Sequence, residues 1–305
     1  MSLITHDQHV LDRAAMLAMR GLMKLSAAPA VAPEGKPAYD ELMARTPAPD
    51  GVAWAAGELG GVPGWWCRSA DAVPGRAILY LHGGCYVLGS AAAYRGFASQ
   101  IATRAKAATF VAEYRLAPEH PFPAAFEDGC RALEGLSAAG FDRVAVAGDS
   151  AGGGLALAVL AAGAANARPV AAALFSPWVD LSLAGGTMES RADVDPILSR
   201  TALQQGADQY LRGTDPHDPR ASPLSGDLAK LPPIRIDVGD DEVLLDDSLR
   251  FEAAARAADI ACELHVWAGM VHVFPTNVSM LKAAREALDG VGAFLNAALA
   301  RAAAV

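Results

Sequence analysis

The chain has 305 residues, with 25 lysines and arginines against 34 aspartates and glutamates, so its formal net charge is −9. Hydrophobic residues make up 52% of the sequence, which excludes a disordered chain and supplies enough apolar surface for a core. A negative charge without a run of lysine or arginine argues against nucleic acid or an anionic membrane as a partner. These values predict a soluble globular enzyme with the size of one or two domains.

The four cysteines, at positions 67, 85, 130 and 262, form no C-x-x-C pair. We therefore expect reduced thiols in a cytoplasmic protein rather than a disulfide framework. The N-terminal segment also lacks the basic and then apolar order of a signal peptide. Residues 150–167 carry no charge and have the length of a membrane span, but alanine and glycine dominate this run and a strand-like segment precedes it. We expect a helix buried in the core there.

Short β-prone runs alternate with alanine-rich helical stretches, a pattern that predicts an α/β fold with a mostly parallel sheet of eight strands flanked by helices. The predicted strands are Val52–Glu58, Val62–Arg68, Ala77–Leu81, Thr109–Glu113, Arg143–Ala147, Ala171–Phe175, Ile234–Val238 and Cys262–Trp267. The first two are joined by Gly60-Gly61 and are expected to form an antiparallel hairpin. Helices are predicted near 91–107, 124–139, 151–166, 247–258 and 279–301.

Two segments stand outside this alternation. Residues 1–49 contain an amphipathic helix followed by a connection rich in proline and alanine. Residues 181–230 are rich in proline and aspartate and contain one predicted helix near 199–212. We expect both segments to be additions on the sheet rather than parts of it.

The segment Gly148-Asp149-Ser150-Ala151-Gly152 fits the pattern G-x-S-x-G, between a predicted strand and a predicted helix. A serine at a sharp strand-to-helix turn needs glycine two residues to either side, and the turn exposes its hydroxyl at the helix N-terminus. A phosphate-binding loop is the alternative, but its lysine is missing because Gly154 stands at that position. Ser150 is therefore the predicted nucleophile.

A second glycine-containing turn, His82-Gly83-Gly84, follows the predicted strand 77–81. Acyl transfer places negative charge on a carbonyl oxygen, and backbone N–H groups must converge on that oxygen. Glycine allows such a close approach. The predicted oxyanion hole consists of the N–H groups of Gly83, Gly84 and Ala151.

A serine hydroxyl needs a general base, and histidine is the side chain that titrates near neutral pH. Of seven histidines, His272 is the best candidate because it follows the last predicted strand, at the edge where open α/β sheets place their sites. His82 belongs to the glycine turn, and we expect it to hold that loop.

The orienting carboxylate should come from the loop after the predicted strand 234–238, because α/β hydrolases have the chain order Ser, Asp/Glu, His. The sequence of that loop alone does not decide which of its acids is the orienting carboxylate; the candidates are Asp240, Asp241 and Glu242. Asp246 and Asp247 precede a helical stretch and are interpreted as helix N-cap residues. The sequence has no H-E-x-x-H and no spaced His/Cys ligands, so we expect no metal and no other cofactor.

These motifs, in this order, resemble the bacterial hormone-sensitive-lipase-like (family IV) carboxylesterases of the α/β-hydrolase fold. The blocks that carry the resemblance are His82-Gly83-Gly84, 114–125, 148–153, 176–181, 221–224 and 269–274. The resemblance implies an α/β-hydrolase core at 50–180 and 226–305, and a helical cap formed by 1–49 and 181–225. It also places Glu242 at the position of the family's triad acid, with Asp241 as the second choice.

The implied activity is that of a serine hydrolase that cleaves carboxylic esters, with short acyl esters or lactones as expected substrates and an acyl-enzyme on Ser150. An amidase or deacetylase with the same triad is the alternative, and a non-catalytic small-molecule receptor is a third reading. Cys85 replaces the family's third glycine and places a thiol beside the predicted hole, where we expect a bulky thiol reagent to reach it. Residues expected to line the substrate pocket are Cys85, Tyr86, Met270, Val271 and Phe274. Family members often dimerise through the edge strand, here 262–267.

Overall fold

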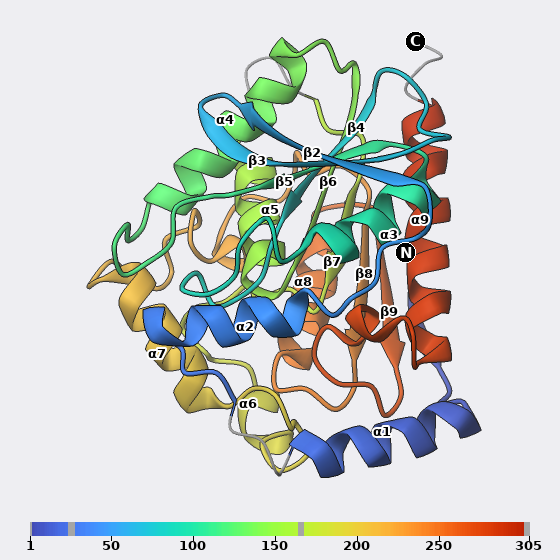
Figure 1. The fold of residues 1–305 in the computed structure, drawn as a ribbon. Coiled ribbons are helices and arrows are strands. Elements are labelled where there is room, and N and C mark those ends of the chain that lie inside the picture. The colour runs from blue at the N-terminus through green and yellow to red at the C-terminus, as the bar shows by residue number, and fades with distance from the viewer. Residues whose placement is uncertain (1, 24–27, 164–167, 302–305) are drawn as a thin grey trace.

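The computed structural model describes residues 2–23, 28–163 and 168–301 (Figure 1). Its centre is a nine-stranded sheet with the order β1-β9-β8-β7-β6-β4-β5-β3-β2. The strands are β1 Ser2–His6, β2 Val52–Leu59, β3 Val62–Ser69, β4 Arg76–Leu81, β5 Ala108–Ala112, β6 Arg143–Asp149, β7 Ala172–Phe175, β8 Ile234–Gly239 and β9 Cys262–Trp267. The pairs β2–β3 and β3–β5 are antiparallel, and the other pairs are parallel.

All eight predicted strands are present, with ends within two residues of the prediction. The ninth, β1, pairs in parallel with β9 from Ser2 opposite Glu263 to His6 opposite Trp267. Two expectations are therefore wrong: residues 1–49 are not wholly outside the sheet, and strand 262–267 is not an edge strand that is open to a second copy of the chain. A five-residue strand held by backbone pairing, with Leu3 half exposed, has too little side-chain pattern to be seen in the sequence.

The helices form a layer on each face of the sheet. The core helices are α3 Arg95–Ala105, α4 Ala124–Ala138, α5 Ser150–Ala162, α8 Leu245–Ala257 and α9 Lys282–Arg301. α3 and α9 pack against each other on one face, while α4, α5 and α8 pack on the other. Alternation along β4 shows why two layers are needed: Leu79 and Leu81 enter one hydrophobic cluster, and Ile78 and Tyr80 enter the other.

The uncharged run at 150–167 is a core helix as far as the structure describes it. α5 is buried along its length up to Leu160 and contacts β4, β6 and β7, while residues 164–167 lie outside the described residues. Within the described ranges, no helix is both long and apolar enough to cross a membrane.

Four further helices lie together in the lower part of Figure 1: α1 Val10–Met23, α2 Lys36–Met43, α6 Thr187–Ser190 and α7 Arg200–Leu211. α1 is tied to the core by Asp12, whose buried carboxylate accepts the N–H groups of Lys282 and Ala283 at 2.8 Å each. These are the first residues of α9, so Asp12 caps a helix that lies 270 positions away in the sequence.

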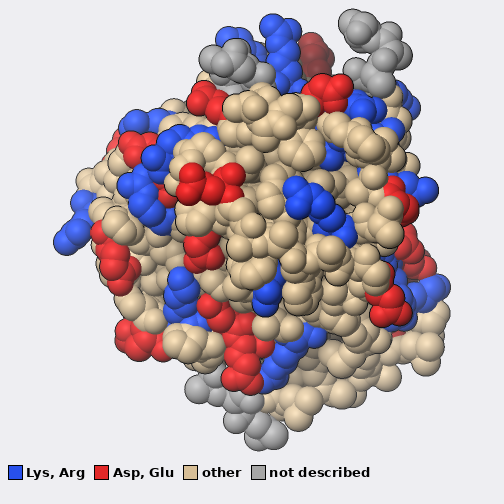
Figure 2. All heavy atoms as spheres, turned by 45° about the horizontal axis from the view of Figure 1, so that its top comes forward, with Lys and Arg blue, Asp and Glu red and all other residues tan. Residues whose placement is uncertain are grey.

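The charged side chains do not gather by sign on the face shown in Figure 2. Basic and acidic groups alternate there and are separated by wide uncharged areas. This face therefore has no basic patch of the kind that binds a phosphate backbone.

Candidate active site

Ser150 occupies a sharp turn between β6 and α5. Its φ is +51°, in the left-handed region that a residue with a Cβ rarely adopts. The chain passes so closely here that a Cβ on Gly152 would lie 2.2 Å from the carbonyl oxygen of Leu81, and one on Gly148 would lie 2.5 Å from the carbonyl oxygen of Gly152. No side chain fits at either glycine of the motif, and the turn has the geometry of a nucleophile elbow.

Asp149 ties this elbow to the glycine turn after β4. Its buried carboxylate accepts the hydroxyls of Tyr80 at 2.6 Å and Tyr94 at 3.0 Å, and the N–H of Gly83 at 3.0 Å. Burial raises the pKa of Asp149 to about 6, although the three donors act in the opposite direction. The carboxylate therefore fixes the distance between the two loops that carry the predicted nucleophile and the predicted oxyanion hole.

The same contact corrects one predicted donor. The N–H of Gly83 is used by Asp149, so it is not available for an oxyanion in this arrangement. The N–H groups of Gly84, Cys85 and Ala151, by contrast, donate to no acceptor among the residues that the structure describes. The prediction for Gly83 is therefore wrong, while those for Gly84 and Ala151 remain compatible with the structure.

His82 holds the glycine turn, as expected. Its ring stacks between Tyr94 and Tyr114, with centroids at 5.2 Å and 4.4 Å. Its Nδ1 lies 2.8 Å from the carbonyl oxygen of Gly83, and the hydroxyl of Tyr114 donates to the carbonyl oxygen of His82 at 2.6 Å. Burial lowers the pKa of His82 to about 4, so this imidazole is neutral at physiological pH.

The loops after β8 and β9 bring Glu242 and His272 together. Nδ1 of His272 lies 2.5 Å from Oε2 of Glu242, whose side chain is fully buried. The other carboxylate oxygen accepts the hydroxyl of Ser176 at 2.8 Å and the N–H of Gly239 at 2.9 Å. The alternative acid, Asp241, instead forms an ion pair with Arg20 of α1 at 2.5 Å. The geometry thus joins His272 to Glu242 and leaves Asp241 in a different contact.

The environment of His272 favours its charged form. Burial is the largest single influence and lowers the pKa of His272. The charge and hydrogen bond of Glu242, together with the charges of Asp195 and Asp149, outweigh it, and the net shift of this pKa is upward. A histidine that becomes a better base through a buried carboxylate is the arrangement expected of a general base beside a serine.

Ser176 is a site residue to which the sequence reasoning gave no role. It follows β7, has a φ of +47°, and is fully buried. Its Oγ donates to Glu242 and also accepts the N–H of Val273, the residue after His272, at 3.1 Å. One hydroxyl therefore links the acid to the histidine loop. The available signal was its position directly after a buried strand, at the sheet edge that carries the other loops.

Comparison with known proteins identifies the family. Residues 78–276 match a family model described as alpha/beta hydrolase fold. An acetyl-hydrolase from Streptomyces hygroscopicus is 43% identical over 237 residues, which cover 76% of this chain and 79% of that protein. The crystal structure of an esterase from the bacterial hormone-sensitive lipase family superposes with a TM-score of 0.88 at 35% identity, covering 95% of this chain and 98% of that one. The chain belongs to the bacterial hormone-sensitive lipase family.

An esterase from Acinetobacter venetianus is 33% identical over 85% of this chain and 87% of its own length. A crystal structure of EstE5, soaked with ethyl alcohol, has a TM-score of 0.87 at 36% identity and covers 93% of this chain and 98% of that one. These similarities span both the core and the segments outside it, so the resemblance to the hormone-sensitive lipase family extends over almost the whole chain.

In this family member, the expected pocket residues are all buried. Met270, Val271 and Phe274 share a hydrophobic cluster with Met16 and Met19 of α1, which accounts for their apolar character without a substrate. Their contact with substrate stays a prediction.

Cys85 and Tyr86 likewise face the protein interior. Burial raises the pKa of Cys85 to about 12, so the thiol stays protonated. Only 5% of this residue is exposed, and the expectation that a bulky thiol reagent reaches it is wrong.

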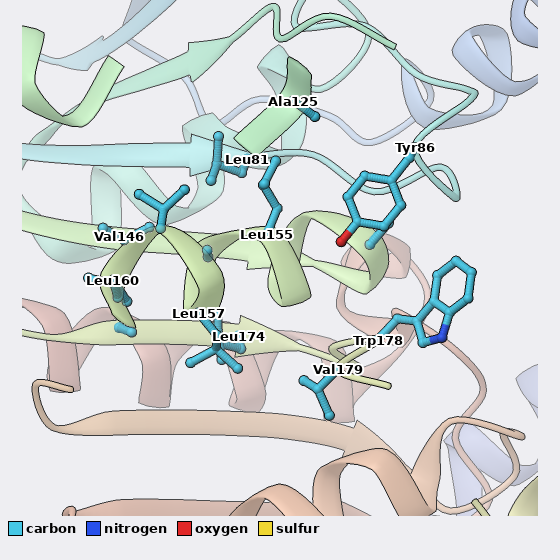
Figure 3. Close-up of a cluster of buried hydrophobic side chains, with 14 of the residues drawn as sticks. Leu81, Tyr86, Ala125, Val146, Leu155, Leu157, Leu160, Leu174, Trp178 and Val179 are labelled. Carbon is cyan, nitrogen blue, oxygen red and sulfur yellow. The ribbon is translucent and has the colours of Figure 1, made fainter. Parts of the chain in front are cut away.

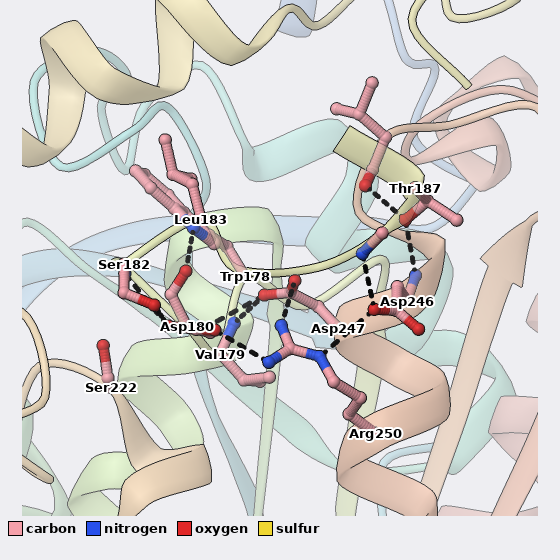
Figure 4. A network of polar contacts seen from close by, with 12 residues as sticks. Trp178, Val179, Asp180, Ser182, Leu183, Thr187, Ser222, Asp246, Asp247 and Arg250 are labelled. Carbon is pink, nitrogen blue, oxygen red and sulfur yellow. Dashed lines mark hydrogen bonds and ion pairs between the residues drawn. The ribbon is translucent and has the colours of Figure 1, made fainter. Parts of the chain in front are cut away.

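Asp246 and Asp247 are not helix N-cap residues in this hydrolase. Oδ2 of Asp247 accepts the N–H groups of Val179 at 2.9 Å and Asp180 at 3.0 Å, and Asp246 accepts the N–H of Gly186 at 2.9 Å (Figure 4). Arg250 forms ion pairs with both aspartates and with Asp180. This network anchors the chain where it leaves β7 and enters the segment that carries α6 and α7.

Proposed function

We propose that this chain hydrolyses carboxylic esters through an acyl-enzyme on Ser150, with His272 as general base and Glu242 as the orienting acid. The observation that carries this proposal is the 2.5 Å contact between His272 and Glu242, formed by the loops after β9 and β8. β6 lies next to β7 and parallel to it, and β7 and β8 are paired in the same way, so the elbow at Ser150 belongs to the same edge of the sheet.

In the proposed first step, Nε2 of His272 takes the proton of the Ser150 hydroxyl while Oγ attacks the ester carbonyl carbon. The N–H groups of Gly84, Cys85 and Ala151 stabilise the negative charge on the carbonyl oxygen. The imidazolium then returns its proton to the departing alcohol, which leaves an acyl-enzyme. In the second half of the reaction, His272 takes a proton from a water molecule, which attacks the acyl-enzyme carbonyl. The proton then returns to Oγ of Ser150 as the carboxylic acid is released. Glu242 binds Nδ1–H and keeps Nε2 free to accept a proton.

The proposed substrates are esters with short acyl chains, or lactones. The name of the Streptomyces hygroscopicus relative, an acetyl-hydrolase, supports a small acyl group. Residues 1–49 and 181–225 are proposed as a cap over the core at 50–180 and 226–305, with β1 as the exception because it belongs to the sheet. The positions of α1, α2, α6 and α7 at one end of the molecule support this division.

The test is a panel of p-nitrophenyl esters from acetate to octanoate, lactones and N-acetyl substrates, assayed with the native chain and Ser150→Ala. We expect turnover of the short esters, and a loss of at least about 10⁴-fold in Ser150→Ala, since nucleophile loss in such triads is of this order. Equal activity of the two proteins would refute the assignment of Ser150. Preference for N-acetyl substrates would instead identify an amidase or deacetylase.

A further inference from the structure

The loop after β4 has an unusual backbone. Three successive residues have positive φ: Gly84 at +114°, Cys85 at +55° and Tyr86 at +63°. The carbonyl oxygen of Gly84 closes this turn by accepting the N–H groups of Val87 at 3.0 Å and Leu88 at 2.8 Å. Glycine adopts such a conformation freely, but cysteine and tyrosine do not, and non-glycine residues stay there only when their surroundings impose it.

Those surroundings come largely from α7, outside the hydrolase core. The ring of Tyr86 stacks on the ring of Tyr210, with centroids 3.8 Å apart and an angle of 4° between the planes. One helical turn earlier, Gly206 lies directly against Cys85: a Cβ added there would be 2.8 Å from the Cβ of Cys85 and 3.1 Å from its carbonyl oxygen. Gly206 and Tyr210 thus contact the two strained residues from the same face of one helix.

Tyr86 also packs against the core. Its ring belongs to the hydrophobic cluster in Figure 3 together with Leu155 of α5 and Trp178. Its carbonyl oxygen accepts the N–H of Ala117 at 2.9 Å. Tyr86 therefore contacts both the core and α7, and loss of the Tyr210 ring would remove its α7 contact.

The contribution of Tyr210 comes from its ring. Its hydroxyl is buried and has no hydrogen-bond partner among the residues that the structure describes. Its carbonyl oxygen accepts the N–H of Phe122 at 2.8 Å, so the end of α7 is fixed to the core next to the stack. The backbone that carries the Tyr210 ring is thus tied to the segment that contains Phe122.

We propose that Gly206 and Tyr210 are positioning residues, which hold Cys85 in the left-handed conformation that presents its N–H to the oxyanion. This inference rests on the proposed function, because it assigns Cys85 N–H to the hole. It makes α7 part of the machinery that stabilises the transition state, in addition to its place over the core.

The test compares Tyr210→Leu, which removes the stack, with Tyr210→Phe, which keeps the ring. Loss of a whole oxyanion donor costs roughly 10²–10³-fold in kcat, so a displaced donor should cost about 10- to 100-fold. We expect this fall in kcat for Tyr210→Leu with KM changed little, and retention of most of the activity by Tyr210→Phe. The inhibition constant of an alkylboronic acid, which forms a tetrahedral adduct with the serine, should rise in parallel with the loss in kcat.

Gly206→Ala tests the second contact, and its rescue separates positioning from general damage. The added methyl group collides with Cys85, so kcat should fall, whereas Cys85→Gly in the same chain removes the colliding Cβ and should restore part of kcat. Gln205→Gly is the matched control, because it weakens α7 at an exposed neighbouring position and should leave kcat unchanged. Thermal unfolding and circular dichroism show whether each variant is folded.

The outcomes separate the two proposals. If the native chain hydrolyses esters and Ser150→Ala does not, while folded Tyr210→Leu and Gly206→Ala keep full kcat, the positioning role is refuted and the proposed function stands. Equal losses in Tyr210→Leu and Tyr210→Phe, or a loss in Gly206→Ala that Cys85→Gly does not reduce, would also overturn it. If the native chain and Ser150→Ala behave alike, the proposed function itself fails.

Discussion

Ser176→Ala removes one hydroxyl that serves two of the loops at the site. The hydroxyl donates to the Glu242 carboxylate at 2.8 Å and accepts the N–H of Val273 at 3.1 Å, and both contacts are buried. A hydrogen bond to a charged group contributes about 1.5–3 kcal/mol, and an orphaned buried N–H costs about 1–3 kcal/mol. Gly239 still donates to the same carboxylate oxygen, so Glu242 stays partly held.

From these values together we expect the free energy of unfolding to fall by about 2.5–6 kcal/mol. We also expect kcat/KM to fall by about 10- to 100-fold, since each 1.4 kcal/mol of lost transition-state stabilisation is worth roughly tenfold. Loss of this donor leaves the charge of the Glu242 carboxylate less stabilised by hydrogen bonds, so the carboxylate favours the protonated form of His272 more strongly. The acidic limb of the pH profile should therefore move to higher pH.

Ser176→Gly is the matched control, because Ser176 has a φ of +47°. Glycine relieves a left-handed strain of about 1–2 kcal/mol but also lacks the hydroxyl. It should unfold at a higher urea concentration than Ser176→Ala and yet lose the same activity on p-nitrophenyl butyrate. If Ser176→Ala matched the native chain in both urea midpoint and kcat/KM, the linking role would be refuted. Recovery of activity in Ser176→Gly would show that strain, and not the hydroxyl, matters.

Three further outcomes are expected. Glu242→Gln should lower kcat/KM by about 10³–10⁴-fold. It should also move the acidic limb of the pH profile to lower pH, because it removes a charge that raises the pKa of His272. A larger loss of kcat/KM in Asp241→Asn would show that the acid is misassigned. Asp12→Ala should reduce the urea-derived stability by about 1–2 kcal/mol through loss of the α9 cap, and an unchanged midpoint would contradict that role. As the pH falls from about 6.5 to about 4, the free energy of unfolding should decrease, because His82 takes up a proton in the unfolded chain but stays neutral in the folded one. An equal dependence of this free energy on pH in folded His82→Gln would exclude His82 as the cause.

The core was predictable from the sequence because its signals are local. Alternating β-prone and alanine-rich segments located the eight strands of the core, and the end of each strand located a loop. Since parallel strands end at one edge, the loops that contain Glu242 and His272 could be expected to meet there. Among the nearby acids, the resemblance to the family chose Glu242, and the contact with His272 agrees with this choice.

The features of the site and the sheet that could not be predicted depend on contacts between segments that are distant in the sequence. Gly83 could not be separated from Gly84 as a donor, because the acceptor of its N–H is a side chain 66 positions away. The roles of Ser176 and Asp247 likewise depend on partners in other loops. β1 was missed because its partner, β9, lies at the other end of the chain.

The pairing of β1 with β9 and the Asp12 cap on α9 affect the order of events during synthesis. Lys282, whose N–H Asp12 accepts, lies 270 positions after Asp12 in the sequence. At about 5–20 residues per second, the ribosome needs roughly 15–55 s to synthesise this stretch. During that time the central strands can form and pair, while Met16 and Met19 lack the hydrophobic cluster that later covers them. The N-terminal segment can therefore complete the sheet only after β9 has been synthesised, and a closure over so many residues is of the kind that slows folding.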